Sequence, residues 1–259
     1  MSGFVDKKML IEVEKPVSLE FKYLRPSLLL GLLKNLKENE KNFDIIKIFE
    51  IGSVFYRQED EENQLKKISI LSTDDDFYSL KGKIDVFLNE FTGENIEYLP
   101  DDVSLLEKGR SATIRCSGEA IGVMGDISFQ ALGSLKINKK AVAAEIDVNS
   151  LASLKERVKE YESIYRVPPL IRDIAVLVPE NTLYSGVFEK IKKLGGKTLK
   201  NIELFDYYKG KEIPKDKKSF AFRLYFQLPD KTLSSEEASK LQEKIVDGID
   251  SVEGWAVRK

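Results

Sequence analysis

Apolar positions in the first 155 residues follow helical spacing in some segments and strand-like spacing in others, which predicts a mixed α and β domain. Leucines in the segment 28–36 recur at helical spacing and predict a helix with one buried face. The segment 44–56 is rich in β-branched and aromatic residues and predicts a strand, with a shorter strand over 67–72. Ser79 is expected to cap a second helix. The remaining expected elements are a hairpin over 112–116 and 120–127 and a strand over 142–148.

The segment 170–259 predicts the element order β-α-β-β-α-β, which is the split βαβ arrangement of the ferredoxin-like fold. Strict apolar and polar alternation over 219–228 predicts a strand whose phenylalanines face a core. In this fold both helices cover one face of the sheet, so the other face is expected to be free. The other expected boundaries are strands over 171–178, 199–208 and 255–257, a helix from Ser185 to Gly195 and Gly196, and a helix opened by the capping box of Ser234 and Glu237.

A charge-dense segment that ends at Pro168 and Pro169 separates these two patterns. Two consecutive prolines stiffen the chain and cannot continue a helix. We therefore expect a first domain over 1–155, a linker over 156–169 and a second domain over 170–259.

The composition argues against several classes of enzyme. The chain has no histidine, which excludes Ser-His-Asp and Cys-His nucleophiles and imidazole metal sites. It has one cysteine, Cys116, so it cannot form an intrachain disulfide, and a reducing cytoplasm is expected. No stretch approaches the ~20 apolar residues of a membrane span. These features favour a binding or scaffolding protein, with no membrane partner, over a self-sufficient enzyme.

The charge is unevenly distributed along the chain. The net charge is −2, yet the segment 190–218 holds ten lysines and only four acidic residues. A basic stretch in an acidic chain is typical of a surface that meets phosphate groups, and a solvated lysine-rich surface is the alternative.

Three sequence patterns resemble functional motifs, but none is expected to have the function of the motif. The sequence G-G-K-T (195–198) closes a helix and lacks the spacing of a phosphate-binding P-loop. The acidic clusters 74–76 and 59–62 lack the ligand spacing of a metal site and are expected to be solvated loops. The sequence K-S-F-A-F-R-L-Y (218–225) resembles an RNA-binding RNP1 strand, but Phe220 and Phe222 lie on the apolar stripe and are expected in the core.

The helix-free face of the second domain is the candidate functional site. A tyrosine on it can stack on a base, and an aspartate can accept hydrogen bonds from a guanine, while small residues allow close approach. Lysines around such a platform can meet backbone phosphates of a single-stranded RNA loop. The residues predicted to bind RNA are Asp206, Tyr208, Ser219, Ala221, Arg223, Lys209, Lys217 and Lys218.

Several segments together resemble the β chain of bacterial phenylalanine–tRNA ligases. The C-terminal matches are R-D-I-A (172–175), E-L-F-D-Y-Y-K-G (203–210), I-P-x-x-K-K-S-F-A-F-R-L-Y-F-Q (213–227) and D-K-T-L-S-S-E-E (230–237). The N-terminal matches are Y-L-R-P-S-L-L (23–29), F-E-I-G-S-V-F (49–55), Y-S-L-K-G (78–82) and G-R-S-A (109–112). The similarity covers nearly the whole chain, although the family's β chain is much longer, and Glu107-Lys108 replaces its His-Pro.

The resemblance implies a class II aminoacyl-tRNA synthetase of two α and two β chains that uses ATP and magnesium to join phenylalanine to tRNA(Phe). Catalysis resides in the α chain, and the region 1–155 resembles a catalytically inactive domain that packs against it. The C-terminal domain binds the anticodon stem and loop. Asp206 and Tyr208 match the positions that read and stack the first anticodon base, and Ser219 and Ala221 match the neighbouring strand.

The residues agree with an inactive first domain, because Phe49 precedes Glu50 where a working class II site needs an arginine nearby to neutralise phosphate charge. We expect the chain alone to use no cofactor, bind no metal and charge no tRNA. The expected contact with the α chain comprises Leu28, Leu29, Leu32 and Leu33, with an internal core helix as the alternative. The alternative functions are a free-standing RNA-binding or regulatory protein without a synthetase partner, and a small-molecule enzyme with shifted carboxylates.

Overall fold

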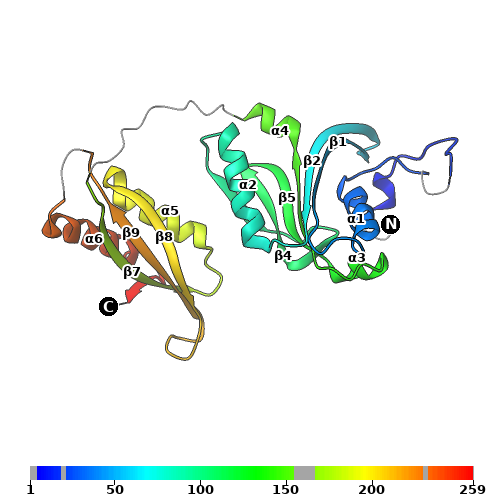
Figure 1. Cartoon of the computed structure of the whole chain (residues 1–259). Helices are drawn as coiled ribbons and strands as arrows, with labels where there is room; N and C mark the ends of the chain where they lie inside the picture. The colour runs from blue at the N-terminus through cyan, green and yellow to red at the C-terminus, as the bar shows by residue number, and fades with distance from the viewer. Residues whose placement is uncertain (1–4, 19–21, 155–166, 230–232, 259) are drawn as a thin grey trace. The chain divides into compact units, whose positions relative to one another are not determined.

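The computed structural model describes residues 5–18, 22–154, 167–229 and 233–258. The chain divides into two compact units, Met1–Lys159 and Glu160–Lys259 (Figure 1). Most of the predicted linker, 156–169, lies outside the described residues, so its boundaries stay a prediction. None of the described helices is both long and apolar enough to cross a bilayer.

The first unit is built on a six-stranded antiparallel sheet with the strand order β1-β2-β6-β5-β4-β3. The strands are β1 (Lys47–Gln58), β2 (Glu61–Ser72), β3 (Ile96–Pro100), β4 (Leu106–Cys116), β5 (Glu119–Ile127) and β6 (Val142–Asp147). The predicted hairpin of β4 and β5 is confirmed, as is the strand β6.

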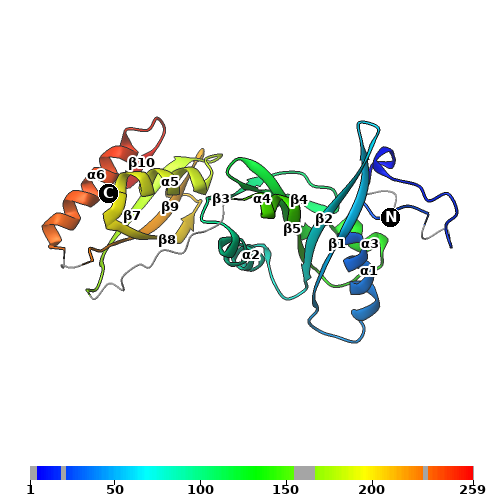
Figure 2. The same cartoon turned by 90° about the horizontal axis from the view of Figure 1, so that it is seen from above.

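Helices cover both faces of this sheet. Because side chains alternate along a strand, Ala143 of β6 packs with α1 and α3 while its neighbour Ala144 packs with α2 and α4. Figure 2 shows the sheet between α2 and the pair of α1 and α3. The helices are α1 (Leu29–Asn39), α2 (Phe77–Phe91), α3 (Phe129–Ser134) and α4 (Val148–Ser153), preceded by the short 3-10 helix η1 (Lys7–Met9).

Several elements of the first unit differ from the sequence prediction. β1 and β2 form one long hairpin. The strand expected over 44–56 covers most of β1, but β2 begins at Glu61 rather than at residue 67, because the polar residues near the turn pair along the ladder as well. The cap of α2 is Asp76, whose carboxylate accepts the amide N–H of Ser79, so the assignment of Ser79 as the cap was wrong. β3, α3 and α4 were missed because each has at most six residues, too few for a clear period.

The leucines of α1 belong to the core of the first unit. Leu28, Leu29, Leu32 and Leu33 are each at most 3% exposed. The last three pack with Leu71 of β2 and with side chains of β6 and α3. The prediction that they contact a partner chain is therefore wrong, because no apolar surface of these side chains remains to be covered. The alternative, an internal core helix, is what the burial shows.

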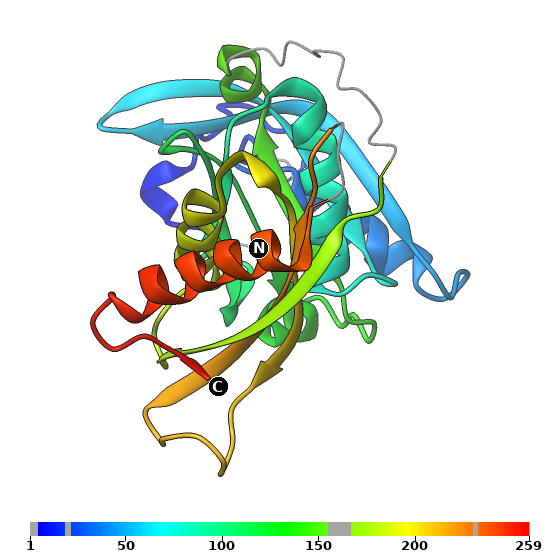
Figure 3. The same cartoon turned by 90° about the vertical axis from the view of Figure 1, so that its left-hand side faces the viewer.

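The second unit has the predicted β-α-β-β-α-β order and a four-stranded antiparallel sheet with the strand order β10-β7-β9-β8. Figures 1 and 3 show α5 and α6 side by side on one face of this sheet. The elements are β7 (Leu170–Pro179), α5 (Tyr184–Gly195), the 3-10 helix η3 (Gly196–Thr198), β8 (Leu199–Tyr208), β9 (Lys217–Phe226), α6 (Ser235–Asp250) and β10 (Ala256–Arg258).

The core of the second unit lies between the sheet and the two helices. Phe220, Phe222, Leu224 and Phe226 of β9 are at most 4% exposed and pack with residues of α5 and α6. Their expected place in the core, rather than on an RNA-binding face, is thus confirmed. The capping box at Ser234 is also confirmed, since its side chain accepts the amide of Glu237 and the Glu237 carboxylate accepts the amide of Ser234.

Candidate nucleic-acid interface

The pairing of β8 with β9 determines which side chains share the helix-free face. Directly paired residues of an antiparallel ladder point to the same side of the sheet. Asp206 pairs with Ala221, and Tyr208 pairs with Ser219. Since Ala221 and Ser219 alternate with the buried phenylalanines, all four residues lie on the face without helices. Ala221 also pairs with Ala175 of β7, so small side chains lie beside Asp206.

Tyr208 lies against the chain that follows it. A Cβ atom built on Gly210 would be 2.5 Å from the Tyr208 hydroxyl oxygen, so a side chain at this position would displace the ring from its place. Ser219 is only 6% exposed, which makes it a small spacer beneath the face rather than a group open to a ligand. A tyrosine held at the end of a strand beside a carboxylate can stack on an unpaired base while Asp206 accepts hydrogen bonds from the edge of the base.

An aromatic and charged group lies next to these residues. The register between β8 and β9 shifts between Leu204 and Asp206, which leaves Phe205 as an extra residue in a β-bulge. The ring of Phe205 is 46% exposed, and its centroid lies 4.9 Å from the guanidinium carbon of Arg223. Two hydrogen bonds of 3.0 Å join the guanidinium to the carboxylate of Asp173 on β7.

The ionisation of this pair follows from its geometry. The hydrogen bonds from Arg223 hold the pKa of Asp173 below its usual value, and Asp173 in turn raises the pKa of Arg223. Nearby, the hydroxyl of Tyr225 donates a 2.6 Å hydrogen bond to Glu203, which raises the pKa of that tyrosine. Arg223 therefore lies on the predicted face, but its charge is already paired within the protein.

The predicted lysines do not all lie on this face. Lys217 alternates with Ser219 and Ala221 and shares their side of the sheet. Lys218 pairs with the buried Val178 and stands 5.1 Å over the ring of Phe220, so it lies on the opposite side. The assignment of Lys218 to the RNA-binding face is therefore wrong, because neighbouring residues of a strand point to opposite faces and Lys218 follows Lys217 directly. Partial burial lowers the pKa of Lys218, and the neighbouring Lys209 lowers it further. Lys209 forms an ion pair with Glu180.

Sequence reasoning missed Phe205, Asp173 and Gly210. If the strand alternated regularly, placing Asp206 and Tyr208 on the helix-free face would turn Phe205 toward the helices. A bulge cannot be recognised from the spacing of apolar residues, so its effect on Phe205 was missed. Asp173 interrupts the apolar run of β7. A charged side chain within such a run needs a charged or hydrogen-bonding partner on its side of the sheet, and this could have indicated the pair with Arg223. Gly210 follows Tyr208 closely enough to suggest contact between a ring and the backbone.

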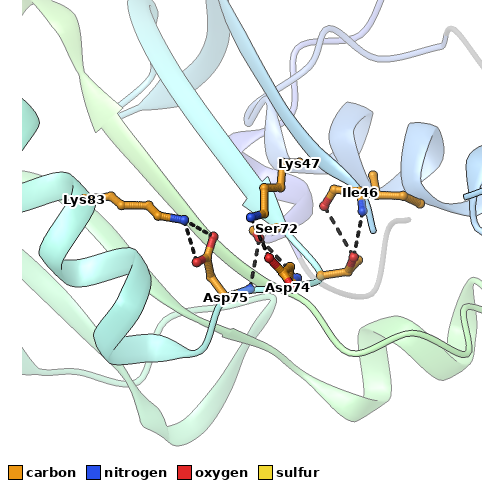
Figure 4. Close-up of polar contacts among 7 residues, drawn as sticks. Ile46, Lys47, Ser72, Asp74, Asp75 and Lys83 are labelled. Carbon is orange, nitrogen blue, oxygen red and sulfur yellow. Dashed lines mark hydrogen bonds and ion pairs between the residues drawn. The ribbon is translucent and has the colours of Figure 1, made fainter. Parts of the chain in front are cut away.

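Two carboxylates of the acidic cluster 74–76 form ion pairs within the first unit. Lys47 pairs with Asp74 at 2.6 Å, and Lys83 reaches both carboxylate oxygens of Asp75 at 2.6 and 2.7 Å (Figure 4). Lys83 is the main cause of the lowered pKa of Asp75. Within the described ranges no group of three or more acidic or cysteine side chains could hold a metal ion. The segment 74–76 is a loop with Asp74 and Asp76 exposed, as expected, and its carboxylates form ion pairs and a helix cap.

Glu50 of β1 lies in a polar contact beside helix α1. Its carboxylate is paired with Arg25, whose Nε also donates a hydrogen bond to the carbonyl of Ser53. Helix α1 approaches the same carboxylate at Gly31, where an added Cβ atom would lie 3.5 Å from Glu50 Oε2. Glu50 is thus engaged by Arg25 and lies beside helix α1.

A buried carboxylate fastens α1 to the sheet. Glu145 of β6 is 5% exposed. Its Oε1 accepts hydrogen bonds from the Ser27 hydroxyl, the Leu28 amide and the Ser69 hydroxyl at 2.8–2.9 Å. Its Oε2 accepts one from the Lys67 ammonium at 2.8 Å. Both oxygens of this carboxylate have hydrogen-bond partners within the protein, so we interpret Glu145 as a structural group and not as a catalytic acid or base.

Two family models match the chain. The model described as the phenylalanyl-tRNA synthetase β chain CLM domain matches residues 4–148. The model described as the ferredoxin-fold anticodon-binding domain matches residues 166–258, which include the whole helix-free face described above.

Curated relatives match over nearly all of the chain. The phenylalanine–tRNA ligase β subunit of Moorella thermoacetica is 31% identical over 96% of this chain and 33% of its own length. The subunits of Clostridium acetobutylicum and Bacillus subtilis are 27% and 29% identical over 96% and 95% of the chain. The chain spans about a third of the length of these relatives.

Proposed function

The chain belongs to the family of phenylalanyl-tRNA synthetase β chains, and from this premise we propose that its second unit binds the anticodon region of tRNA(Phe). The first unit packs against the catalytic α chain of an α2β2 ligase in the cytoplasm. ATP and magnesium are used by the complete enzyme, and the α chain carries the chemistry that joins phenylalanine to tRNA.

The observation that carries the proposal is the open face formed by β8 and β9. Asp206, Tyr208 and Ala221 lie together on a face that none of the helices in the described part of the chain covers. Recognition of an RNA loop needs unstacked bases that rest on an aromatic ring and present their edges to hydrogen-bonding groups. We infer that Tyr208 stacks on the first anticodon base and that Asp206 accepts hydrogen bonds from its Watson–Crick edge, which suits a guanine.

The charge of the surrounding segment supports the same partner. The segment 190–218 holds ten lysines against four acidic residues. Of its lysines, Lys217 shares the face with Ser219 and Ala221. Ammonium groups next to a stacking platform attract the phosphate backbone without reading its sequence.

The first unit serves as a scaffold in this proposal. Its leucine helix is internal, so the contact with the α chain must use other side chains. Phe49 and Ile51 of the edge strand β1 are 68% and 53% exposed, and they are large apolar groups that such a contact can cover. Co-elution of the chain with the matching α chain tests this part, and separate elution would favour a free-standing RNA-binding protein.

The RNA-binding part is tested with anticodon stem-loops that carry either guanine or adenine at the first anticodon position. We expect Tyr208→Ala to weaken binding by about 1–3 kcal/mol, the usual value for a stacked base. Tyr207→Ala is the matched control, because Tyr207 is the next residue along β8 and packs against Phe220 on the helix side. Equal binding by the parent and Tyr208→Ala, or equal binding of both stem-loops by the parent, would contradict the proposed site.

A further inference from the structure

A second aromatic ring, Phe205, lies beside Asp206 on the proposed RNA-binding face, at the β-bulge in β8. We propose that Phe205 stacks on a second unpaired nucleotide of the same loop, and that Asp173 and Arg223 hold the ring in position. This inference rests on the proposed function of the face, since it adds a second binding position to it.

The bulge brings Asp206 onto the same face as Phe205. Leu204 pairs with Phe222, and Asp206 pairs with Ala221, so β8 has one residue more than β9 at this point. In a bulge of this kind the two residues opposite a single partner point to roughly the same side. Leu204 pairs with the buried Phe222 on the helix side, so its neighbour Phe205 lies on the helix-free face, and the bulge keeps Asp206 on that face as well.

The exposure of the ring indicates a ligand rather than a core role. Phe205 is 46% exposed, although burying a phenylalanine is worth about 1.5–3 kcal/mol. Its contact with Arg223 is 4.9 Å from ring centroid to guanidinium carbon. This cation–π contact supports the ring from one side and leaves nearly half of the side chain open to solvent.

Asp173 fixes the arginine that supports the ring. Nε and Nη2 of Arg223 donate to the two oxygens of Asp173, each at 3.0 Å. A bidentate pair of this kind restrains the guanidinium plane more strongly than a single hydrogen bond. Arg223 is therefore a positioning residue for Phe205, and the earlier assignment of Arg223 as a direct RNA ligand changes accordingly.

The distance along β8 assigns the two rings to different nucleotides. Phe205 and Tyr208 are three residues apart, which corresponds to about 10 Å of strand. Stacked bases in a strand of a duplex are spaced by only about 3.4 Å. Two bases that rest on these rings are consequently splayed apart, which is the arrangement in which single-stranded RNA is read.

The test uses the full chain and stem-loops in which one anticodon position at a time carries the fluorescent base 2-aminopurine. Stacking quenches this base, so each probe reports which ring its position meets. We expect Phe205→Ala to weaken stem-loop binding by about 5- to 150-fold and to relieve quenching at one position. Tyr208→Ala should relieve quenching at a different position. Phe205→Trp should preserve both binding and quenching, because a larger ring occupies the same place.

Asp173→Asn tests the positioning role. It should relieve quenching at the Phe205 position and leave quenching at the Tyr208 position unchanged, with an unfolding temperature close to that of the parent. A variant that lost stability alone would change both probes together, which would overturn the role of Asp173. Tyr207→Ala, with a ring 53% exposed on the helix side, is the control and should change neither probe.

Two outcomes separate this inference from the proposed function. If Tyr208→Ala weakens binding and both Phe205→Ala and Phe205→Leu bind as the parent does, the second stacking position does not exist and the first remains. If the parent binds no stem-loop at all, the RNA-binding role itself fails and the second position fails with it.

Discussion

The carboxylate of Glu145 offers the sharpest test of how the first unit is held together. It accepts hydrogen bonds from two hydroxyls, one backbone amide and one ammonium, and it is almost fully buried. Glu145→Ala removes the acceptor and leaves these donors without a partner. Glu145→Gln keeps one oxygen for Ser27, Leu28 and Ser69 but turns an NH2 group toward the ammonium of Lys67.

The expected size of the effect follows from burial. Removing one member of a buried ion pair costs about 3–5 kcal/mol. The Lys67 side chain is 24% exposed and can regain water, so we expect a loss near the lower end, about 3 kcal/mol for Glu145→Ala. For a unit of this size that lowers the unfolding temperature by about 6–12 °C. Glu145→Gln should lose about 1 kcal/mol, because it gives up only the charged hydrogen bond.

The chain contains its own control for this measurement. Its single tryptophan, Trp255, lies in the second unit, so tryptophan fluorescence follows that unit alone while circular dichroism follows both. In urea, the Glu145 variants should shift the dichroism transition of the first unit and leave the fluorescence transition unchanged. Glu119→Ala, at an exposed position of β5, should shift neither. A loss below 1 kcal/mol for Glu145→Ala, or equal losses for both Glu145 variants, would refute the argument.

Two further predictions concern the second unit. Because Arg223 depresses the pKa of Asp173 below its ordinary value of 3.8, the stability from this pair is fully present above that value and is lost as the pH falls through the lower folded pKa. Acid titration followed by tryptophan fluorescence should show this loss in the parent and not in Asp173→Asn, with a size below about 1 kcal/mol since both side chains are partly exposed. In RNA titrations at several salt concentrations, Lys217→Ala should reduce the slope of log K against log salt by about 0.7, the value for one phosphate contact of a single strand, whereas Lys218→Ala on the opposite side should not. Equal slopes for the two lysine variants would remove Lys217 from the phosphate contacts.

Much of the second unit could be predicted from its sequence because its signals are periodic and local. The unbroken alternation of β9 determined which side of the strand enters the core, and the capping box determined where α6 begins. The same alternation placed Ser219 and Ala221 on the open face. These features depend only on neighbouring residues, so the sequence displays them directly.

The errors arose where the answer depends on contacts between distant segments. The leucines of α1 look like a surface for a partner until β2, β6 and α3 are seen to cover them. The bulge at Phe205 depends on the pairing of two strands, and no single strand reveals it. Lys218 was assigned to the wrong face because all lysines of the basic segment were treated together. Adjacent residues of a strand point to opposite sides of the sheet, so Lys217 and Lys218 cannot share a face.

The position of Glu145 in the chain has a consequence for synthesis on the ribosome. The start of α1 emerges more than a hundred residues before the side chain that binds its amide, since Leu28 and Glu145 are 117 residues apart. Until β6 leaves the exit tunnel, the leucine helix has neither its anchor nor the last strand beside β2. The nascent first unit must therefore wait with its most apolar helix only partly covered, by β2 alone among the strands beside it, which makes this interval the one in which a chaperone is most needed.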